Sequence, residues 1–287
     1  MIERVHMFGS HRGLVGVLTE PSSTNKRAHA PAVVFSNVGL NHRVGPGRVY
    51  VELARKLAGA GFVALRFDLS GFGDSERRRT DGSDLDRAVL DTREALDFLE
   101  GKGIRQFVLV GFCSGVDSAH VVALQDPRVV GTVFIDGYAY KNPGFWLRYF
   151  TVRNLQPARW RRHIRQRLAR IRKDKDTEPD TGYAQEVFSR EYPPREKFAS
   201  DIASLVARAV QLLFVYTVVA DNHYNYRNQF YDTFGYRAQI DVEYYTRADH
   251  VFSAEPERTK LVSRLVQWMD DRFTDRPPVV GVQRLSQ

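Results

Sequence analysis

The stretch Val108-Leu109-Val110-Gly111-Phe112-Cys113-Ser114-Gly115 decides how the rest of the chain is interpreted. It starts as an apolar run, typical of a buried parallel strand, and leads into residues with helical spacing. The turn between them fits the pattern Gly-x-Ser-x-Gly, with Cys113 in the place of the serine. The flanking glycines are needed because a Cβ at either position would collide with neighbouring elements. The stretch therefore predicts a strand, a tight turn that presents a Cys113 nucleophile, and a helix.

The residues beside Cys113 leave two alternatives open. A helix that begins after the turn favours a thiolate through its dipole and its free N–H groups. The first alternative is a buried structural cysteine beside two incidental glycines, because cysteine is often a small core residue. The second is Ser114 as nucleophile, but it lies one residue past the tip of the turn, so its side chain should point away. We expect the Ser114 N–H to form half of an oxyanion hole instead.

Outward from this turn, strand and helix patterns alternate along the chain. Two alternating stretches, 4–8 and 14–19, are typical of an antiparallel hairpin. Apolar runs predict strands at 31–36, 62–67, 107–110, 129–135, 211–216 and 239–245. Helical spacing predicts helices at 49–60, 84–99, 114–124, 201–209, 225–234 and 255–273. This order predicts an α/β fold with a mainly parallel, doubly wound sheet and right-handed crossovers.

The alternation stops for a long stretch in the second half of the chain. Residues 137–199 carry no buried-strand pattern and are rich first in aromatic residues and then in arginine, which is typical of a functional insertion. We therefore predict a core made of 1–136 and 200–273, a lid or cap insertion at 137–199, and a loosely held tail at 274–287. A chain of 287 residues is long enough for such a core.

Composition limits the class of protein. Hydrophobic residues make up 43% and charged residues 26%, which is ordinary for a globular protein. No apolar run approaches the roughly 18 residues that span a bilayer, and the N-terminus lacks the apolar stretch of a signal peptide. A single cysteine excludes an internal disulfide and a cysteine-based zinc site. We expect a cytoplasmic enzyme, with a peripheral position at the membrane as an extension, that needs no metal or organic cofactor.

The base that a cysteine nucleophile needs is expected late in the chain. His250 follows the last predicted strand and precedes the last helix, in the order nucleophile, acid, histidine. The acid should end an earlier strand, orient the imidazole and stabilise the imidazolium. Asp221 is the first choice, and Asp136 at the end of the 129–135 strand is the alternative. His223 and His120 are alternative bases, although His120 lies within a helix behind the turn and is expected to pack.

The loop after the 31–36 strand should supply the other half of the oxyanion hole. Val38 or Gly39 is the expected N–H donor, with Asn37 and His42 as side-chain contributors to oxyanion or substrate binding. The turn at 68–75 contains two glycines and two Asp-Ser pairs, which predicts a hydrogen-bonded support for the floor of the site.

Aromatic residues of the insertion could line an acyl pocket or pack within a lid. Tyr138, Phe145 and Trp146 are the candidates for substrate contact. They follow the 129–135 strand, at the edge of the sheet where the nucleophile is expected.

These motifs resemble α/β hydrolases of the lipase, thioesterase and aminopeptidase type. The likeness covers 5–136 and 200–273 and includes the 68–75 turn, the 111–115 turn and the Asp249-His250 pair. Residues 37–46 are similar to hydrolases found beside bacterial exosortase and polysaccharide systems. The departure is Cys113, and in this fold cysteine nucleophiles occur in dienelactone hydrolases and in aminoacyl shuttles of nonribosomal peptide pathways. The resemblance implies an α/β-hydrolase fold with a helical lid, and acyl-Cys chemistry.

The predicted activity is an acyl hydrolase of the esterase or thioesterase type, with Cys113, His250 and Asp221 as its triad. An acyl-Cys113 intermediate is itself a thioester, close in energy to a carrier-bound thioester, so exchange between them is nearly balanced. An acyltransferase or aminoacyltransferase that moves its group between carrier thiols is therefore the first alternative. The second alternative is a non-catalytic binding protein that kept the fold.

The net charge of +8 belongs to one segment. Residues 153–175 hold ten basic residues and one acidic residue, a charge of +9, so the rest of the chain sums to −1. Within this segment 158–173 has the spacing of an amphipathic helix, with Trp160, Ile164, Leu168 and Ile171 on one side. It could be a lid, or it could dock on an acidic acyl-carrier protein or an anionic membrane through Arg159, Arg162, Arg165 and Arg170. No nucleic-acid-binding motif accompanies the charge, so nucleic acid is not an expected partner.

Overall fold

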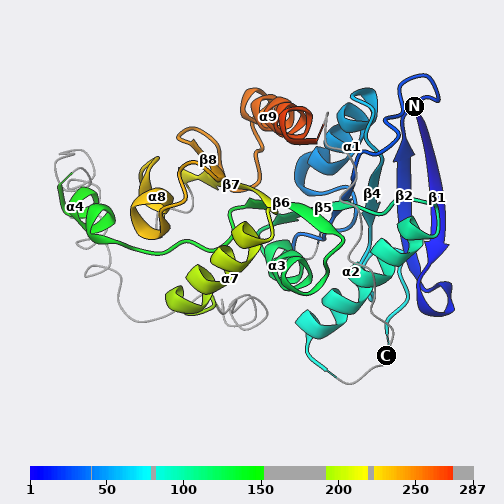
Figure 1. The fold of residues 1–287 in the computed structure, drawn as a ribbon, viewed down its shortest axis with the longest axis horizontal. Coiled ribbons are helices and arrows are strands. Elements are labelled where there is room, and N and C mark those ends of the chain that lie inside the picture. Colours follow the sequence, from blue (N-terminus) through cyan, green and yellow to red (C-terminus); the bar gives the residue numbers. More distant parts are fainter. Residues whose placement is uncertain (40, 79–81, 152–191, 219–222, 274–287) are drawn as a thin grey trace, which may run out of the picture.

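The computed structural model describes residues 1–39, 41–78, 82–151, 192–218 and 223–273. Within them eight strands form one sheet in the order β1-β2-β4-β3-β5-β6-β7-β8 (Figure 1). The pairs β1–β2 and β2–β4 are antiparallel, and from β4 to β8 every neighbouring pair is parallel. The strands are β1 Ile2–Phe8, β2 Leu14–Glu20, β3 Ala32–Phe35, β4 Ala64–Phe67, β5 Phe107–Phe112, β6 Val129–Ile135, β7 Gln211–Thr217 and β8 Ile240–Tyr245.

Helices cover both faces of this sheet (Figure 1). On one face lie α1 (Val49–Gly59) and α9 (Glu255–Phe273), which pack on each other. On the other face α3 (Gly115–Gln125) packs between α2 (Asp84–Glu100) and α7 (Arg195–Ala207). Two further helices, α4 (Pro143–Thr151) and α8 (Gln229–Phe234), contact each other beyond the β8 end of the sheet. Short 3-10 turns lie at Ser10–Arg12 and Pro46–Arg48.

The two faces of β5 explain why its sequence is apolar at every position. Val108, Val110 and Phe112 point to the cluster under α1 and α9, whereas Phe107 and Leu109 point to the cluster under α2 and α3. A strand covered by helices on both sides has no solvent face, so alternation gives way to a continuous apolar run. The same arrangement in the other parallel strands made the predicted sheet recognisable, and the structure confirms it.

Helix boundaries differ from the predicted ones where side chains bind the backbone. The helix predicted from 225 begins at Gln229, because the Gln229 side chain accepts the Asn225 N–H at 2.9 Å and holds the preceding residues as a turn. The helix expected from 201 begins earlier, at Arg195, directly after Pro194. Helix α4 was not predicted; the Asn142 side chain accepts the Phe145 N–H at 2.8 Å and so starts it.

Several predictions lie outside the described residues. The arginine-rich helix at 158–173 and the tail at 274–287 are among them, so the division into core, lid and tail stays a prediction. No helix in the described part of the chain is long and apolar enough to cross a membrane. Nor do three or more His, Cys, Asp or Glu side chains gather there as a metal site would require.

Candidate active site

Cys113 stands at the tip of a very short turn between β5 and α3. The strand ends at Phe112 and the helix begins at Gly115, so only Cys113 and Ser114 make the connection. Cys113 has φ of 53°, a left-handed conformation that costs energy for any residue with a Cβ. Its N–H donates to the carbonyl of Ile135 at 2.8 Å, which fixes the turn to the end of β6. The chain thus holds the thiol on a strained, anchored backbone.

The two glycines of the turn are required by close packing. A Cβ on Gly111 would lie 2.6 Å from the carbonyl oxygen of Gly115 and 2.7 Å from the Cα of Val116. A Cβ on Gly115 would lie 2.5 Å from the carbonyl oxygen of Asn37. All of these neighbours are backbone atoms, which cannot rotate away as a side chain could. The predicted reason for both glycines is therefore confirmed.

The Gly111→Ala variant should lose stability by about 2–4 kcal/mol, because the first turn of α3 must move to admit the methyl group. The matched control is Gly59→Ala, where an added Cβ meets nothing within 4 Å. That change should raise the free energy of unfolding by up to about 1 kcal/mol, because glycine weakens a helix. Urea unfolding of both variants measures the difference. Equal stability of the two variants would contradict the packing argument.

His250 reaches Cys113 from the loop between β8 and α9. The ring lies edge-on against Phe112, with 5.6 Å between centroids, and its side chain is 35% exposed. Its Nδ1 lies 2.9 Å from Oδ2 of Asp136. The hydrogen bonds to Asp136 and to Cys113 raise the pKa of His250 to about 10, against the opposing effect of burial. The structure thus brings the predicted nucleophile and the predicted base together, and both of the partners of His250 favour its protonated form.

Asp136 holds His250 from the end of β6. Its side chain is only 2% exposed, and its φ of 45° turns the backbone sharply away from the strand. Thr217 at the end of β7 donates its N–H to Oδ1 at 2.8 Å and its hydroxyl to Oδ2 at 2.6 Å. With His250, three donors orient the carboxylate. Thr217 was missed in the sequence, although a hydroxyl at the end of the strand next to Asp136 was a usable signal.

The acid bonded to His250 is the second choice from the sequence, not the first. Asp221, the first choice, lies outside the described residues. The position at Nδ1 that was assigned to Asp221 is taken by Asp136. Both aspartates follow strands that are neighbours in the sheet, β6 and β7, which is why both were plausible.

Stability should fall at high pH because of His250. Its pKa of about 10 in the folded state lies above the ordinary value of 6.5, so protonation is more favourable in the folded chain. This stabilisation is complete below about pH 6.5 and is lost as the pH rises toward about 10. Urea unfolding across this range should show the fall, and His250→Gln should flatten it. His223→Gln is the control, since burial lowers the pKa of His223; a wild-type curve parallel to that of His250→Gln would contradict the prediction.

The loop after β3 is tied to the Cys113 turn. The N–H of Gly39 donates to Oγ of Ser114 at 2.8 Å, so the Ser114 hydroxyl braces the loop and is not the group bonded to His250. Val38 is buried and its carbonyl accepts the N–H of Asn41 at 2.8 Å. Of the two expected donors, Gly39 therefore already has an acceptor, and Val38 is the better candidate for the oxyanion hole.

Asn37 has a structural task that the sequence did not reveal. Its Oδ1 accepts the N–H of Leu69 at 2.9 Å, and its Nδ2 donates to the carbonyl of Asn41 at 2.7 Å. Both ends of the amide are used inside the protein, so Asn37 joins the loop to the 68–75 turn. His42, the other predicted contributor, is exposed in the same loop.

The 68–75 turn supports the site as predicted. The buried Asp68 carboxylate accepts the Arg43 N–H at 2.6 Å and pairs with the Arg43 guanidinium. The Ser75 hydroxyl donates to the Asp68 carbonyl at 2.7 Å. Gly73 has φ of 50°, and a Cβ there would strike the Asp68 side chain.

The three aromatic candidates for substrate contact lie in two different places in the structure. Tyr138 is buried, and its ring packs edge-on against His120 and Phe198 in the core under α3 and α7. Phe145 and Trp146 belong to α4, which lies beyond the β8 end of the sheet and away from the start of α3 (Figure 1). The aromatic composition of this stretch did not reveal that the chain leaves the sheet edge after β6. His120 packs in the core, as expected, with Nε2 3.4 Å from Oδ2 of Asp201.

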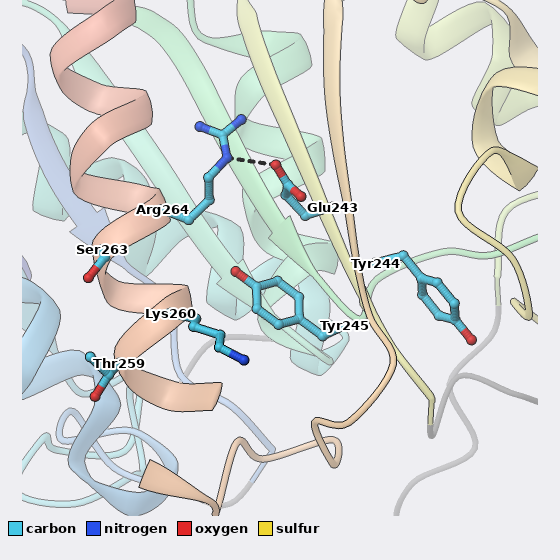
Figure 2. Close-up of a pocket in the computed structure, with 7 residues that line it drawn as sticks. All are labelled: Glu243, Tyr244, Tyr245, Thr259, Lys260, Ser263 and Arg264. Atoms are coloured by element: carbon cyan, nitrogen blue, oxygen red, sulfur yellow. Dashed lines mark hydrogen bonds and ion pairs between the residues drawn. The ribbon is translucent and has the colours of Figure 1, made fainter. Parts of the chain in front are cut away.

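A hollow of about 420 Å³ lies between the outer side of β8 and α9 (Figure 2). Tyr245 points toward the helix, whereas Tyr244 points to the opposite side of the strand. The Arg264 Nε donates to the Glu243 carboxylate at 2.7 Å across this hollow. Neither Cys113 nor His250 lines it, so the hollow is separate from the candidate active site.

The chain is similar to known proteins in sequence and in fold. The family model described as "Alpha/beta hydrolase family" matches residues 34–283, a range that contains Cys113, Asp136 and His250. No curated protein matches the chain by sequence. Among solved structures, an α/β serine hydrolase homologue from Coxiella burnetii is 16% identical, with a TM-score of 0.56 over 93% of this chain and 97% of the other. A proline iminopeptidase from Mycobacterium smegmatis is 16% identical, with a TM-score of 0.54 over 94% and 98%.

A third structure is a serine hydrolase without a lid from Xanthomonas campestris, 16% identical, with a TM-score of 0.54 over 96% of both chains. These likenesses show the fold, and the family model covers most of the sequence, including the Cys113 turn. The chain belongs to the alpha/beta hydrolase family.

Proposed function

We propose that the chain is an acyl hydrolase of the esterase or thioesterase type that works through a covalent acyl-Cys113 intermediate. The observation that carries the proposal is the hydrogen-bonded series of Cys113, His250 and Asp136 at the carboxyl ends of β5, β8 and β6. A protonated His250 beside Cys113 favours the thiolate form, which is the nucleophilic form of cysteine. The thiolate then needs no base at the moment of attack.

The reaction would proceed in two halves. The Cys113 thiolate attacks the carbonyl carbon, a C–S bond forms, and the carbonyl electrons move to oxygen. The tetrahedral adduct collapses, the bond to the leaving alkoxide or thiolate breaks, and His250 gives that group its proton. In the second half, neutral His250 takes a proton from water, the hydroxide adds to the acyl-Cys113 carbon, and the thiolate leaves with the acid as product.

Two backbone N–H groups would hold the oxygen of the tetrahedral adduct. We assign them to Ser114 and Val38, because the Gly39 N–H already donates to Ser114 Oγ. The Gly39–Ser114 bond would keep the two donors at a constant separation. Preorganised donors of this kind stabilise the transition state by about 3–4 kcal/mol each.

The cysteine itself favours one alternative activity. Its acyl-enzyme is a thioester, so passing the group to an acceptor thiol is nearly balanced in energy, whereas a serine ester would resist that transfer. The alternative is therefore an acyltransferase or aminoacyltransferase that works with carrier-bound thioesters. An acidic acyl-carrier protein is the partner that this alternative requires.

Intact mass after incubation with acyl thioesters of increasing chain length tests the proposal. A Cys113-dependent adduct that clears in water supports hydrolysis. An adduct that persists until a thiol or amine is added supports transfer. Failure of every donor to give an adduct, with Cys113→Ala as the blank, would contradict both and favour a non-catalytic binding protein.

A further inference from the structure

Helix α4 presents an exposed apolar face. Phe145 points inward and is 1% exposed, whereas Trp146, Leu147 and Phe150 are 42%, 64% and 58% exposed. The rings of Trp146 and Phe150 stack one helical turn apart, with 5.8 Å between centroids. Exposed apolar side chains that lie together, unlike scattered ones, indicate a surface that meets something apolar.

This face is held firmly from behind. The Asn142 side chain starts the helix through the Phe145 N–H, and the Asn225 side chain donates to the Phe145 carbonyl at 3.1 Å. The Arg148 guanidinium lies 4.0 Å from the centre of the Tyr226 ring. Polar and cationic contacts to α8 and the loop before it thus fix which side of α4 faces outward. The exposure of the aromatic side chains follows from the fold and not from a loosely packed helix.

Positive charge lies beside this face. The Lys141 ammonium lies 5.2 Å from the centre of the Trp146 ring, and Arg148, which contacts Tyr226 on the inward side of the helix, is also exposed. Helix α4 lies at one end of the molecule (Figure 1), so a flat surface could approach it without meeting the sheet.

We infer that α4 docks the chain on an anionic lipid surface, with Trp146, Leu147 and Phe150 in the headgroup region. Tryptophan and phenylalanine favour that interface, and nearby lysines and arginines bind acidic headgroups. An acidic protein partner would engage the basic residues but would not need three exposed apolar side chains. The inference rests on α4 and its charges alone, so it stands or falls independently of Cys113 chemistry.

Sedimentation of the full chain with lipid vesicles tests the inference. Vesicles of phosphatidylcholine with about 30% phosphatidylglycerol should bind the chain at least ~10-fold more tightly than phosphatidylcholine alone. The double variant Trp146→Ser, Phe150→Ser should bind the anionic vesicles about 10-fold less tightly or worse. The matched control is Leu85→Ser, Leu90→Ser on α2, whose side chains are 40% and 41% exposed and which should leave binding unchanged.

A second measurement does not depend on that variant folding. Brominated lipids should quench Trp146 fluorescence in a Trp160→Phe chain, while Trp268, which is 1% exposed, stays unquenched as an internal reference. The inference is overturned if the wild type ignores anionic vesicles, or if the double variant binds as the wild type does. It is also overturned by two results together: a lower melting temperature of the double variant and no quenching of Trp146 by the brominated lipids. These results would mean that Trp146 and Phe150 pack against other residues of this chain and not against lipid. Binding to an acidic carrier protein without vesicle binding overturns it as well.

Discussion

Cys113→Ala is expected to lower kcat/KM for acyl thioesters by about 10,000-fold or more, the scale of loss when a covalent nucleophile is removed. Alanine keeps the turn and leaves no group to attack. Cys113→Ser should not restore full activity, because a serine hydroxyl, unlike a thiol, does not ionise beside His250 and must lose its proton as it attacks. The product is measured by chromatography at low concentrations of the wild-type enzyme and high concentrations of the variants, so that fast and very slow rates can both be determined.

Ser114→Ala is the matched control for that experiment. It removes the hydroxyl that accepts the Gly39 N–H, so it should slow the reaction without abolishing the acyl adduct. An active Cys113→Ala enzyme beside an inactive Ser114→Ala enzyme would transfer the nucleophilic role to Ser114. Intact mass of both variants after incubation with an acyl donor distinguishes the two nucleophiles, because Cys113→Ala removes the only thiol in the chain.

Asp136→Asn is expected to lower kcat by about 1,000- to 10,000-fold while leaving the fold intact, as loss of the carboxylate does in related triads. The carboxylate fixes the proton on Nδ1 of His250 at 2.9 Å and stabilises the imidazolium; an amide does neither reliably. Thr217→Val should have a smaller effect, because it removes one of the donors that orient Asp136 and keeps the charge.

The variant Asp221→Asn tests which of the two candidate aspartates, Asp136 or Asp221, acts with His250. If Asp136 acts, Asp221→Asn should keep nearly all of the activity, and the rate constants of both variants with one substrate settle the assignment. A severe loss in Asp221→Asn with normal rates in Asp136→Asn would reverse it. The pKa of His250 gives a second measurement, since NMR titration should show it falling in Asp136→Asn and unchanged in Asp221→Asn.

The fold could be predicted from the sequence because its strands are buried on both faces. Such strands give continuous apolar runs, and the glycines of the 111–115 turn marked a place where a strand passes directly into a helix. Cys113 and His250 follow from this topology, since each occupies a loop at the carboxyl end of a strand. Local pattern and overall fold agree at these positions, and for that reason the interpretation succeeded there.

The remaining features of the site depend on the directions that the backbone and the side chains take, which a sequence pattern does not encode. Asp136 and Asp221 both follow strands, and which carboxylate meets His250 depends on a backbone turn of φ 45° that nothing in the order of residues announces. Asn37 was a candidate for oxyanion or substrate binding, and the sequence did not reveal that its amide also joins Asn41 in its own loop to Leu69, 32 residues away along the chain. For Phe145 a pocket and packing within a lid both stayed open, because the path of the chain after β6 could not be predicted.

Cys113 and Asp136, which both have a positive φ, are held to the sheet in the same way. The Cys113 N–H donates to the last residue of β6, and the Asp136 N–H donates to Val215 in β7 at 2.8 Å. The hydrogen bonds of the sheet therefore continue past the ends of its strands and hold Cys113 and Asp136 in one register. Opening the site means breaking sheet hydrogen bonds, so these two amides should exchange with solvent as slowly as the centre of β5. The loops that surround the site can then vary, while the distance between Cys113 and Asp136 is set by the spacing of the strands.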